Sequence, residues 1–364
     1  MSHLSAYTIG RDNNYNLLRV LAATIIAFYH CFFMALGPVM TDDTYPALYQ
    51  LSQIVLNFFF VASGFLIAQS FERRRDLVSY IVARCLRLLP GVFVLSVLVC
   101  FVVGPMVTDV SIADYFGALQ TWAYVPLTTL LQPDAVLPGV FASNPNPDEI
   151  VTAMWTLRYE VVCYVGLAFV GVVIGLQRSF KFTILMGLFV CCYGVISYLT
   201  DLREIAAVNH LMHFGLSFFI GMVFFVYRSM IVLHWGIAVG ASLLAFVAYQ
   251  IFGNGAEPVV IGAMAYVVFW LAYVPGGFIR KYNQMGDYSY GIYIYHYPVQ
   301  QILMHWIGGF SPVGLFAFSF PLVVCLAILS WVLVERPALK QLPCFSAWLK
   351  AKLPGRWLAA RENV

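Results

Sequence analysis

Charged residues are scarce in this sequence. Only 10% of its 364 residues are Asp, Glu, Lys or Arg, whereas 62% are hydrophobic. A soluble domain carries about 25% charged residues, because its surface must face water. Together with a mean hydropathy of +0.83, this composition excludes a soluble globular protein. It indicates a polytopic membrane protein, in which the lipid-facing side chains are apolar as well.

Several motifs of soluble enzymes and metal proteins are also missing. The sequence has no CxxC pair, no Cys/His metal spacing, and no usable G-x-S-x-G, H-E-x-x-H, Walker or dinucleotide-binding pattern. Six of the eight cysteines lie in apolar runs, which is typical of small buried hydrophobic residues. We therefore expect no metal site, no permanently bound cofactor and no nucleic-acid partner. The polar N-terminus and the absence of a cleavage site after the first apolar run predict no cleaved signal.

Long apolar runs recur along the chain, and each is long enough to cross a bilayer as a helix. The sequence predicts an all-α integral membrane protein with about ten transmembrane helices and no internal repeat. The expected spans are 15–37, 48–71, 88–107, 153–176, 180–200, 208–227, 230–251, 256–274, 288–308 and 312–335.

The distribution of positive charge supports this topology. With the N-terminus in the cytoplasm, only Arg158 and Arg203 of the 20 Lys and Arg residues fall on the outer side. The stretch 88–157 has no Lys or Arg at all. Both termini are therefore expected in the cytoplasm, and the membrane is expected to be the bacterial inner membrane.

Three regions are not expected to span the membrane. Residues 72–87 form a basic amphipathic stretch that we expect at the inner interface. Residues 112–131 predict an interfacial or partly re-entrant helix, followed by a loop rich in Pro, Asn and Gly. Residues 341–364 form a cationic amphipathic tail expected on the lipid of the inner leaflet, after a single transmembrane domain over 1–340.

The first span carries Arg19 and His30. Eleven residues advance a helix by about 16.5 Å and rotate it by about 20°, so the two side chains share one face. Arg19 lies near the cytoplasmic end and His30 lies past the middle. An interface anchor would explain Arg19 alone, and an interhelical hydrogen bond would explain His30 alone. Their spacing favours function, because ionisable groups inside a membrane are costly.

Two further segments offer donor-side candidates. Ala62, Ser63 and Gly64 interrupt a bulky run in the second span, which favours close helix packing; alternatively Ser63 or the backbone lies beside a cavity. Arg84 and Arg87 are neighbours on one helix face. They are either topology signals to anionic lipid or a clamp for phosphate oxygens, which the guanidinium fork suits.

Outer-side candidates lie at the start of the fourth span. Arg158 and Glu160 fall in its first two turns, where the helix N-terminus tolerates a carboxylate. They indicate either a structural ion pair, Arg203 being a candidate partner, or groups facing a cavity that receives a polar acceptor. Asp42 and Asp43 open onto the same side.

The ninth span places His296 among tyrosines at mid-depth. It is either a satisfied structural histidine or a residue lining a polar cleft. Glu335 closes the last span, where we expect it to be a counter-ion for inner arginines.

In this order the motifs resemble those of the acyltransferase-3 family of bacterial inner-membrane acyltransferases, which O-acylate surface and exported glycans. The resemblance covers about residues 10 to 340, and the loop "LPGVFASNPNPDE" is similar to that of exopolysaccharide acyltransferases. Besides Arg19 and His30, the motifs that carry it are "FFFVASGFLIA", "RCLRLLP", "WTLRYE", "YSYGIYIYHYP" and "VERP".

The resemblance implies an acyl-CoA donor in the cytoplasm, most often acetyl-CoA, and an acceptor hydroxyl of a glycan or lipid-linked glycan in the periplasm. The family's essential arginine and histidine correspond to Arg19 and His30. Its paired arginines correspond to Arg84 and Arg87, and its glutamate corresponds to Glu160. His30 would act as general base, because an imidazole pKa of about 6.5 suits that task.

Other readings stay open on sequence alone. A transporter or flippase of a lipid or glycan would also use intramembrane polar residues, although the sequence shows no inverted repeat. An acyltransferase that handles succinyl or another larger acyl group has the same motifs. A homo-oligomer is also left open.

Overall fold

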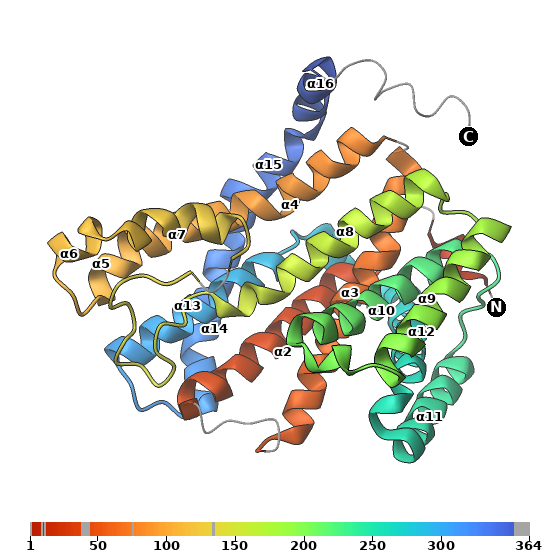
Figure 1. Cartoon of the computed structure of the whole chain (residues 1–364), viewed down its shortest axis with the longest axis horizontal. Helices are drawn as coiled ribbons and strands as arrows, with labels where there is room; N and C mark the ends of the chain where they lie inside the picture. The colour runs from red at the N-terminus through yellow and green to blue at the C-terminus, as the bar shows by residue number, and fades with distance from the viewer. Residues whose placement is uncertain are drawn as a thin grey trace. The chain divides into compact units, whose positions relative to one another are not determined.

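The computed structural model describes residues 2–8, 10, 12–37, 44–74, 76–132 and 135–352. Within these ranges every named element is helical, and the only β pairing consists of isolated bridges. Figure 1 shows the arrangement of these helices along the chain. The predicted all-α fold is confirmed.

Ten long helices correspond in order to the ten expected spans. They are α2 (Tyr15–Leu36), α3 (Pro46–Arg74), α4 (Leu77–Leu98), α8 (Thr156–Val173), α9 (Phe180–Tyr198), α10 (Ala206–Val226), α11 (Trp235–Phe252), α12 (Glu257–Tyr273), α13 (Ser289–Trp306) and α14 (Pro312–Ser330).

Shorter elements connect or extend the long helices. They are α1 (Leu4–Tyr7), η2 (Val99–Val103), α5 (Gly104–Val107), α6 (Ile112–Gly117), α7 (Leu119–Thr129), η3 (Thr152–Trp155), η4 (Asp201–Glu204), η5 (Gly253–Ala256), η6 (Gly277–Gln284), η7 (Trp331–Glu335), α15 (Arg336–Lys340) and α16 (Leu342–Lys352).

Eight helices in the described part of the chain are long and apolar enough to cross a membrane. This number is lower than ten for two reasons. The segment Trp235–Tyr273 counts once because η5 joins α11 directly to α12, although the backbone turns at Gly253 (φ 55°) and the two helices pack against each other. The tyrosines, glutamines and histidines of α13 make that helix too polar to qualify. The protein is therefore a multi-pass membrane protein.

The chain divides into two compact units. The first contains the described residues of Met1–His30, Val39–Glu72 and Trp155–Ser289; the second contains those of Cys31–Pro38, Arg73–Met154 and Tyr290–Val364. Each unit is assembled from separate stretches of sequence, so each depends on contacts between residues far apart in the chain.

In the first unit, α3 and α10 cross at a pair of glycines. A Cβ atom on Gly64 would lie 2.1 Å from the carbonyl oxygen of Phe218, and one on Gly221 would lie 2.1 Å from that of Val61. The two backbones therefore approach more closely than any larger residue permits. The small-residue packing predicted for Ala62–Gly64 is confirmed at Gly64.

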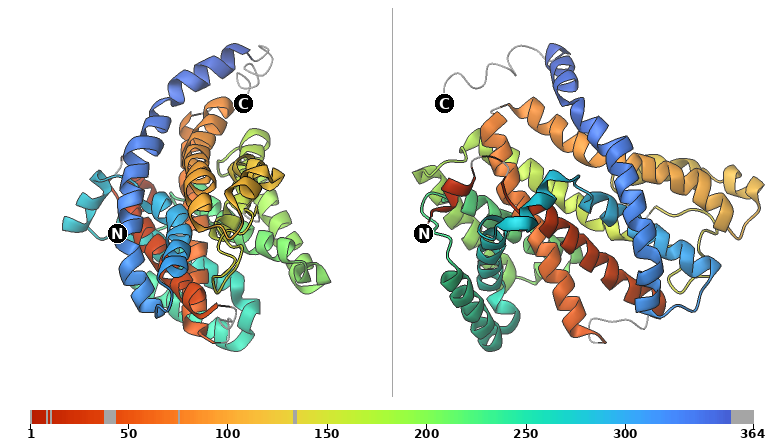
Figure 2. Two further views of the ribbon diagram at one scale, coloured as in Figure 1. Left: turned by 90° about the vertical axis from the view of Figure 1, so that its left-hand side faces the viewer. Right: turned by 180° about the vertical axis from the view of Figure 1, so that it is seen from behind.

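In the second unit, α4 continues through η2 into α5, so that one helical segment runs from Leu77 to Val107. The helices α7 and α16 pack along α4, as Figures 1 and 2 show. Most of the stretch 72–87 belongs to this helix, and its expected position at the inner interface stays a prediction. Charged residues precede the apolar run that begins at Leu88, but the helix begins before them, at Leu77.

The start of α4 is held from two directions. The Asp76 carboxylate accepts hydrogen bonds from the backbone N–H groups of Val78 and Ser79 at 3.1 and 3.3 Å, which caps the helix. The same carboxylate forms an ion pair with Lys350 of α16. The expected amphipathic tail is thus helical over Leu342–Lys352 and is anchored on α4.

Candidate active site

Arg19 lies in the second turn of α2, within the first unit. Its Nη1 atom forms a salt bridge of 2.6 Å with Oδ2 of Asp287. The other carboxylate oxygen of Asp287 accepts a hydrogen bond of 2.6 Å from the hydroxyl of Ser289. The Arg19 side chain remains 27% exposed, so the pair fixes the guanidinium without enclosing it.

Sequence reasoning missed Asp287. A signal was present, because this aspartate precedes the tyrosine-rich ninth span on the side of the membrane where Arg19 was expected. Nothing local, however, links two residues that are 268 positions apart.

His30 lies on the same helix as Arg19. Because α2 is an uninterrupted α-helix over Tyr15–Leu36, the separation along the axis is about 16.5 Å and the two residues share a face. The imidazole is half-buried, and its ring packs edge-on to that of Tyr29 with 5.4 Å between centroids. An imidazole in this position is accessible enough to exchange a proton with a bound group.

A carboxylate lies in the second turn of α8, within the first unit. Glu160 Oε1 accepts a hydrogen bond of 3.2 Å from the Ser63 hydroxyl of α3 and a second one from the hydroxyl of Tyr164, one turn further along α8. Ser63 therefore contacts Glu160, which sequence reasoning had placed on the acceptor side. The role of Tyr164 was not predicted, because its position gave no signal beyond helical spacing.

Arg158 and Arg203 do not join this carboxylate. Arg158 donates from Nε to the backbone oxygen of Trp155 at 3.2 Å and lies over the Tyr159 ring. Arg203 forms a salt bridge of 2.9 Å with Glu257. The suggested ion pair of Arg203 with the Arg158–Glu160 segment is therefore wrong, because the start of α12 supplies a carboxylate that sequence reasoning did not consider.

The second unit holds the paired arginines. Arg87 Nη1 lies 3.4 Å from Oε2 of Glu335, and its guanidinium lies over the Tyr290 ring at 5.3 Å. The other carboxylate oxygen of Glu335 accepts a hydrogen bond of 3.0 Å from Ser330. The prediction that Glu335 is a counter-ion for an inner arginine is confirmed. Arg84, one turn before Arg87 on α4, is half-buried.

His296 of α13 is completely buried, and its Nδ1 atom lies 3.2 Å from the backbone oxygen of Ile292. This enclosure favours the structural interpretation of His296 over a residue that lines an open cleft. Asp42 and Asp43, the other acceptor-side candidates, lie outside the described residues.

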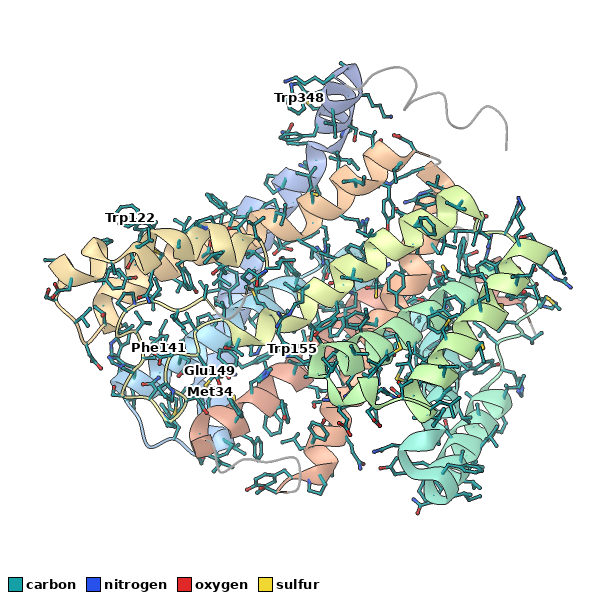
Figure 3. All side chains as sticks on the ribbon, viewed as in Figure 1. Met34, Trp122, Phe141, Glu149, Trp155 and Trp348 are labelled. Carbon is teal, nitrogen blue, oxygen red and sulfur yellow. The ribbon has the colours of Figure 1, made fainter. Side chains whose placement is uncertain are left out.

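A polar cluster that sequence reasoning missed holds the loop before α8 in the second unit. Tyr297 donates a hydrogen bond to Glu149. Gln301 donates from Nε2 to the backbone oxygens of Asn146 and Glu149, and its Oε1 accepts from Asn144 at 2.6 Å. Figure 3 shows Glu149 beside the labelled Phe141 and Met34. These bonds fix the loop that precedes η3 on α13.

The sequence is similar to those of known proteins. Residues 12–332 match the profile of the family described as "Acyltransferase domain", Acyl_transf_3. The chain is 28% identical to the "O-acetyl transferase" of Shigella phage Sf6 over 346 residues, which cover 90% of this chain and 96% of that protein. It is 26% identical to "Nodulation protein 10" of Rhizobium leguminosarum bv. viciae over 388 residues, covering 93% and 96%.

No solved structure matches the chain significantly. The family profile nevertheless spans nearly the whole transmembrane region and includes Arg19, His30, Ser63, Arg84 and Glu160. The chain belongs to the acyltransferase-3 family and is an integral membrane acyltransferase.

Proposed function

We propose that this protein moves an acyl group, most simply acetyl, from cytoplasmic acyl-CoA to a hydroxyl of a surface or exported glycan in the periplasm. It would do so as a multi-pass protein of the bacterial inner membrane. The observation that carries the proposal is the position of Arg19 and His30 on one face of the uninterrupted helix α2. Their separation of about 16.5 Å is a large part of the hydrophobic thickness of a bilayer.

The donor side of the proposal rests on arginines. Arg19 is held by Asp287 and keeps part of its guanidinium exposed, which suits a group that binds phosphate oxygens. The resemblance to the family adds Arg84 and Arg87 as donor-binding candidates. The pantetheine arm spans roughly 15–20 Å when extended, so a donor whose phosphates lie at Arg19 would bring its thioester to the depth of His30.

The chemical step transfers the acyl group from the sulfur of CoA to the acceptor oxygen. The acceptor oxygen attacks the thioester carbonyl while His30 takes the hydroxyl proton. The tetrahedral intermediate collapses, the C–S bond breaks, and the thiolate of CoA leaves and receives a proton from the imidazolium. Glu160, held by Ser63 and Tyr164, would orient the acceptor or the imidazole. A transient acyl-histidine is the alternative route.

The relatives support acetyl as the first acyl group to test, because one of them is named an O-acetyl transferase. Succinyl and larger acyl groups remain alternatives of the same class, and the size of the space around His30 would decide between them. Membership of an acyltransferase family disfavours a transporter or flippase.

Radiolabelled acetyl-CoA added to one side of sealed proteoliposomes tests this function. We expect label to appear on an acceptor enclosed on the opposite side, and unlabelled succinyl-CoA to compete weakly. Transfer of the intact lipid or glycan without acylation would instead support the transporter class. No consumption of any CoA thioester would contradict the proposal.

A further inference from the structure

Four polar residues that the proposed mechanism does not use meet in the first unit. They are Tyr193 in the C-terminal part of α9, Arg203 in η4, His213 in the third turn of α10, and Glu257 at the start of α12. Glu257 accepts hydrogen bonds from Arg203 Nη1 at 2.9 Å, from the Tyr193 hydroxyl at 2.5 Å, and from Nδ1 of His213. His213 and Glu257 lie near the N-terminal ends of their helices, as Glu160 does in α8, whereas Tyr193 lies in the C-terminal part of α9.

This arrangement determines which nitrogen of His213 is available. The Glu257 carboxylate is an acceptor, so Nδ1 of His213 is the donor of this hydrogen bond, and in the neutral tautomer that carries its proton on Nδ1 the other ring nitrogen is an acceptor. The lone pair then lies on Nε2. That atom is buried and has no hydrogen-bond partner among the described residues. A buried acceptor without a partner is unfavourable, and a hydroxyl donor from a ligand would satisfy it.

Phe214 connects the His213 ring to a group of aromatic rings. His210, one turn before His213 on α10, packs against Trp155 with 4.5 Å between ring centroids. Phe214 lies against both Trp155 and His213 at 5.6 and 5.3 Å. Trp155 is half-buried, and Figure 3 places it at the start of α8. Aromatic side chains with one accessible face and a nearby hydrogen-bonding group can pack against the C–H face of a sugar ring.

We propose that Trp155, His210 and His213 form a binding subsite for a hydroxyl-bearing sugar ring of the acceptor, with His213 Nε2 accepting a hydrogen bond from one sugar hydroxyl. Glu257 is the positioning residue that fixes the imidazole, and Arg203 and Tyr193 fix Glu257. This inference rests on the proposed function and deepens it, because it names the acceptor class and the residues that bind it. The subsite adjoins the helix that carries Glu160.

Two substitutions at His213 separate ligand binding from structure. In His213→Asn the side-chain amide occupies the position of Nδ1, so the bond to Glu257 is kept and the group at Nε2 is lost. In His213→Gln the amide reaches the position of Nε2, and the bond to Glu257 is lost instead. A purely structural role requires Asn to be the milder change, whereas acceptor binding requires Gln to be the milder one.

The assay uses the full chain in nanodiscs with saturating acetyl-CoA and a panel of methyl hexopyranosides as acceptors. We expect His213→Asn to raise the KM for the best accepted glycoside about tenfold, the effect of one lost hydrogen bond to a ligand. The KM for acetyl-CoA should be unchanged, and His213→Gln should be affected less. His305→Asn is the matched control, because Nδ1 of His305 is also buried without a partner among the described residues but lies in the second unit.

The outcomes separate this inference from the proposed function. Suppose that the wild-type protein acetylates glycosides. An unchanged acceptor KM in His213→Asn, or a larger increase of that KM in His213→Gln than in His213→Asn, then overturns the inference alone. A wild-type protein that hydrolyses acetyl-CoA but accepts no glycoside overturns the sugar class. A wild-type protein that consumes no CoA thioester overturns the proposed function itself.

Discussion

Arg19 of α2 and Asp287 form a salt bridge of 2.6 Å, and the Ser289 hydroxyl holds the second oxygen of that carboxylate. The pair fixes a partly exposed guanidinium near the N-terminal end of α2, the helix whose other half carries His30. If this guanidinium binds donor phosphates, its position matters as much as its charge.

Replacing Arg19 should therefore affect donor binding first. We expect Arg19→Gln to weaken acetyl-CoA binding by one to two orders of magnitude, because charge-assisted bonds to phosphate are worth about 1.5–3 kcal/mol. Arg19→Lys should recover only part of the affinity, since it lacks the planar fork. Isothermal titration in nanodiscs measures this. Equal affinity in wild type and Arg19→Gln would remove Arg19 from the donor site.

A substitution of Glu160 should change the rate of acyl transfer and not the affinity for the donor. We expect Glu160→Gln to lower kcat by about two orders of magnitude or more while acetyl-CoA binding is retained, because the amide cannot assist proton transfer. Tyr164→Phe removes one of the two hydrogen bonds to Glu160 and should lower kcat less. Tyr198→Phe, whose hydroxyl bonds the backbone of Gly255, serves as the control. A Glu160→Gln protein with wild-type kcat would restrict Glu160 to a structural role.

Arg87 has two effects that must be separated. Its partner Glu335 has a side chain only 1% exposed, so Arg87→Gln leaves a buried carboxylate and should destabilise the protein by about 3 kcal/mol or more. The double variant Arg87→Gln/Glu335→Gln removes both charges and should regain most of that stability.

Donor affinity should not return in that double variant if Arg87 binds phosphate. Thermal unfolding and acetyl-CoA titration, measured on the same three proteins, distinguish the two effects. Full donor affinity in the stable double variant would show that Arg87 serves Glu335 alone.

The glycine crossing of α3 and α10 predicts a local packing defect. A Gly221→Val side chain would collide with the backbone at Val61, and overpacking of this kind costs about 1–3 kcal/mol. Gly215→Ala on the same helix α10 meets no atom within 4 Å and should be neutral. A fluorescence-detected thermal shift compares the two. Equal melting temperatures for both variants would contradict the close approach of these helices.

The contact between α16 and α4 should depend on pH. Burial works to raise the pKa of Asp76, but hydrogen bonds from Lys350 and Ser79 outweigh burial and hold this pKa below its usual range. The stabilisation is therefore present above about pH 4, the ordinary carboxyl value, and is lost as the pH falls through the lower folded value.

Spin labels on the exposed Cys344 of α16 and on a cysteine introduced in α4 measure this contact. We expect an unchanged distance from pH 8 to pH 5 and a broadened distance distribution in Asp76→Asn at every pH. A narrow, wild-type distribution in Asp76→Asn would show that this ion pair does not hold the tail helix.

Local sequence patterns predicted the features that depend on a single helix. The helical period placed Arg19 and His30 on one face of α2, and the segregation of charge paired Glu335 with inner arginines, which Arg87 confirms. The small residues near Gly64 predicted close packing but did not identify α10 as the partner. The low content of charged residues likewise predicted the spans. It did not predict that the helix of the third span begins at residue 77, before the apolar run.

Lateral pairing between helices could not be predicted. Arg203 was expected near Glu160 because both were predicted on the outer side, yet Glu257 at the start of α12 is its partner. Asp287 was missed for the same reason. Topology gives the depth and side of a residue, whereas the choice among several helices at one depth depends on packing over hundreds of residues.

The most direct test of the central claim compares donor binding with transfer in His30→Ala. The account predicts that purified His30→Ala in nanodiscs is folded and binds acetyl-CoA as wild type does, but transfers acetyl at least about a hundredfold more slowly. Transfer at the wild-type rate by the folded variant would contradict His30 as the general base, and with it the reaction path along α2.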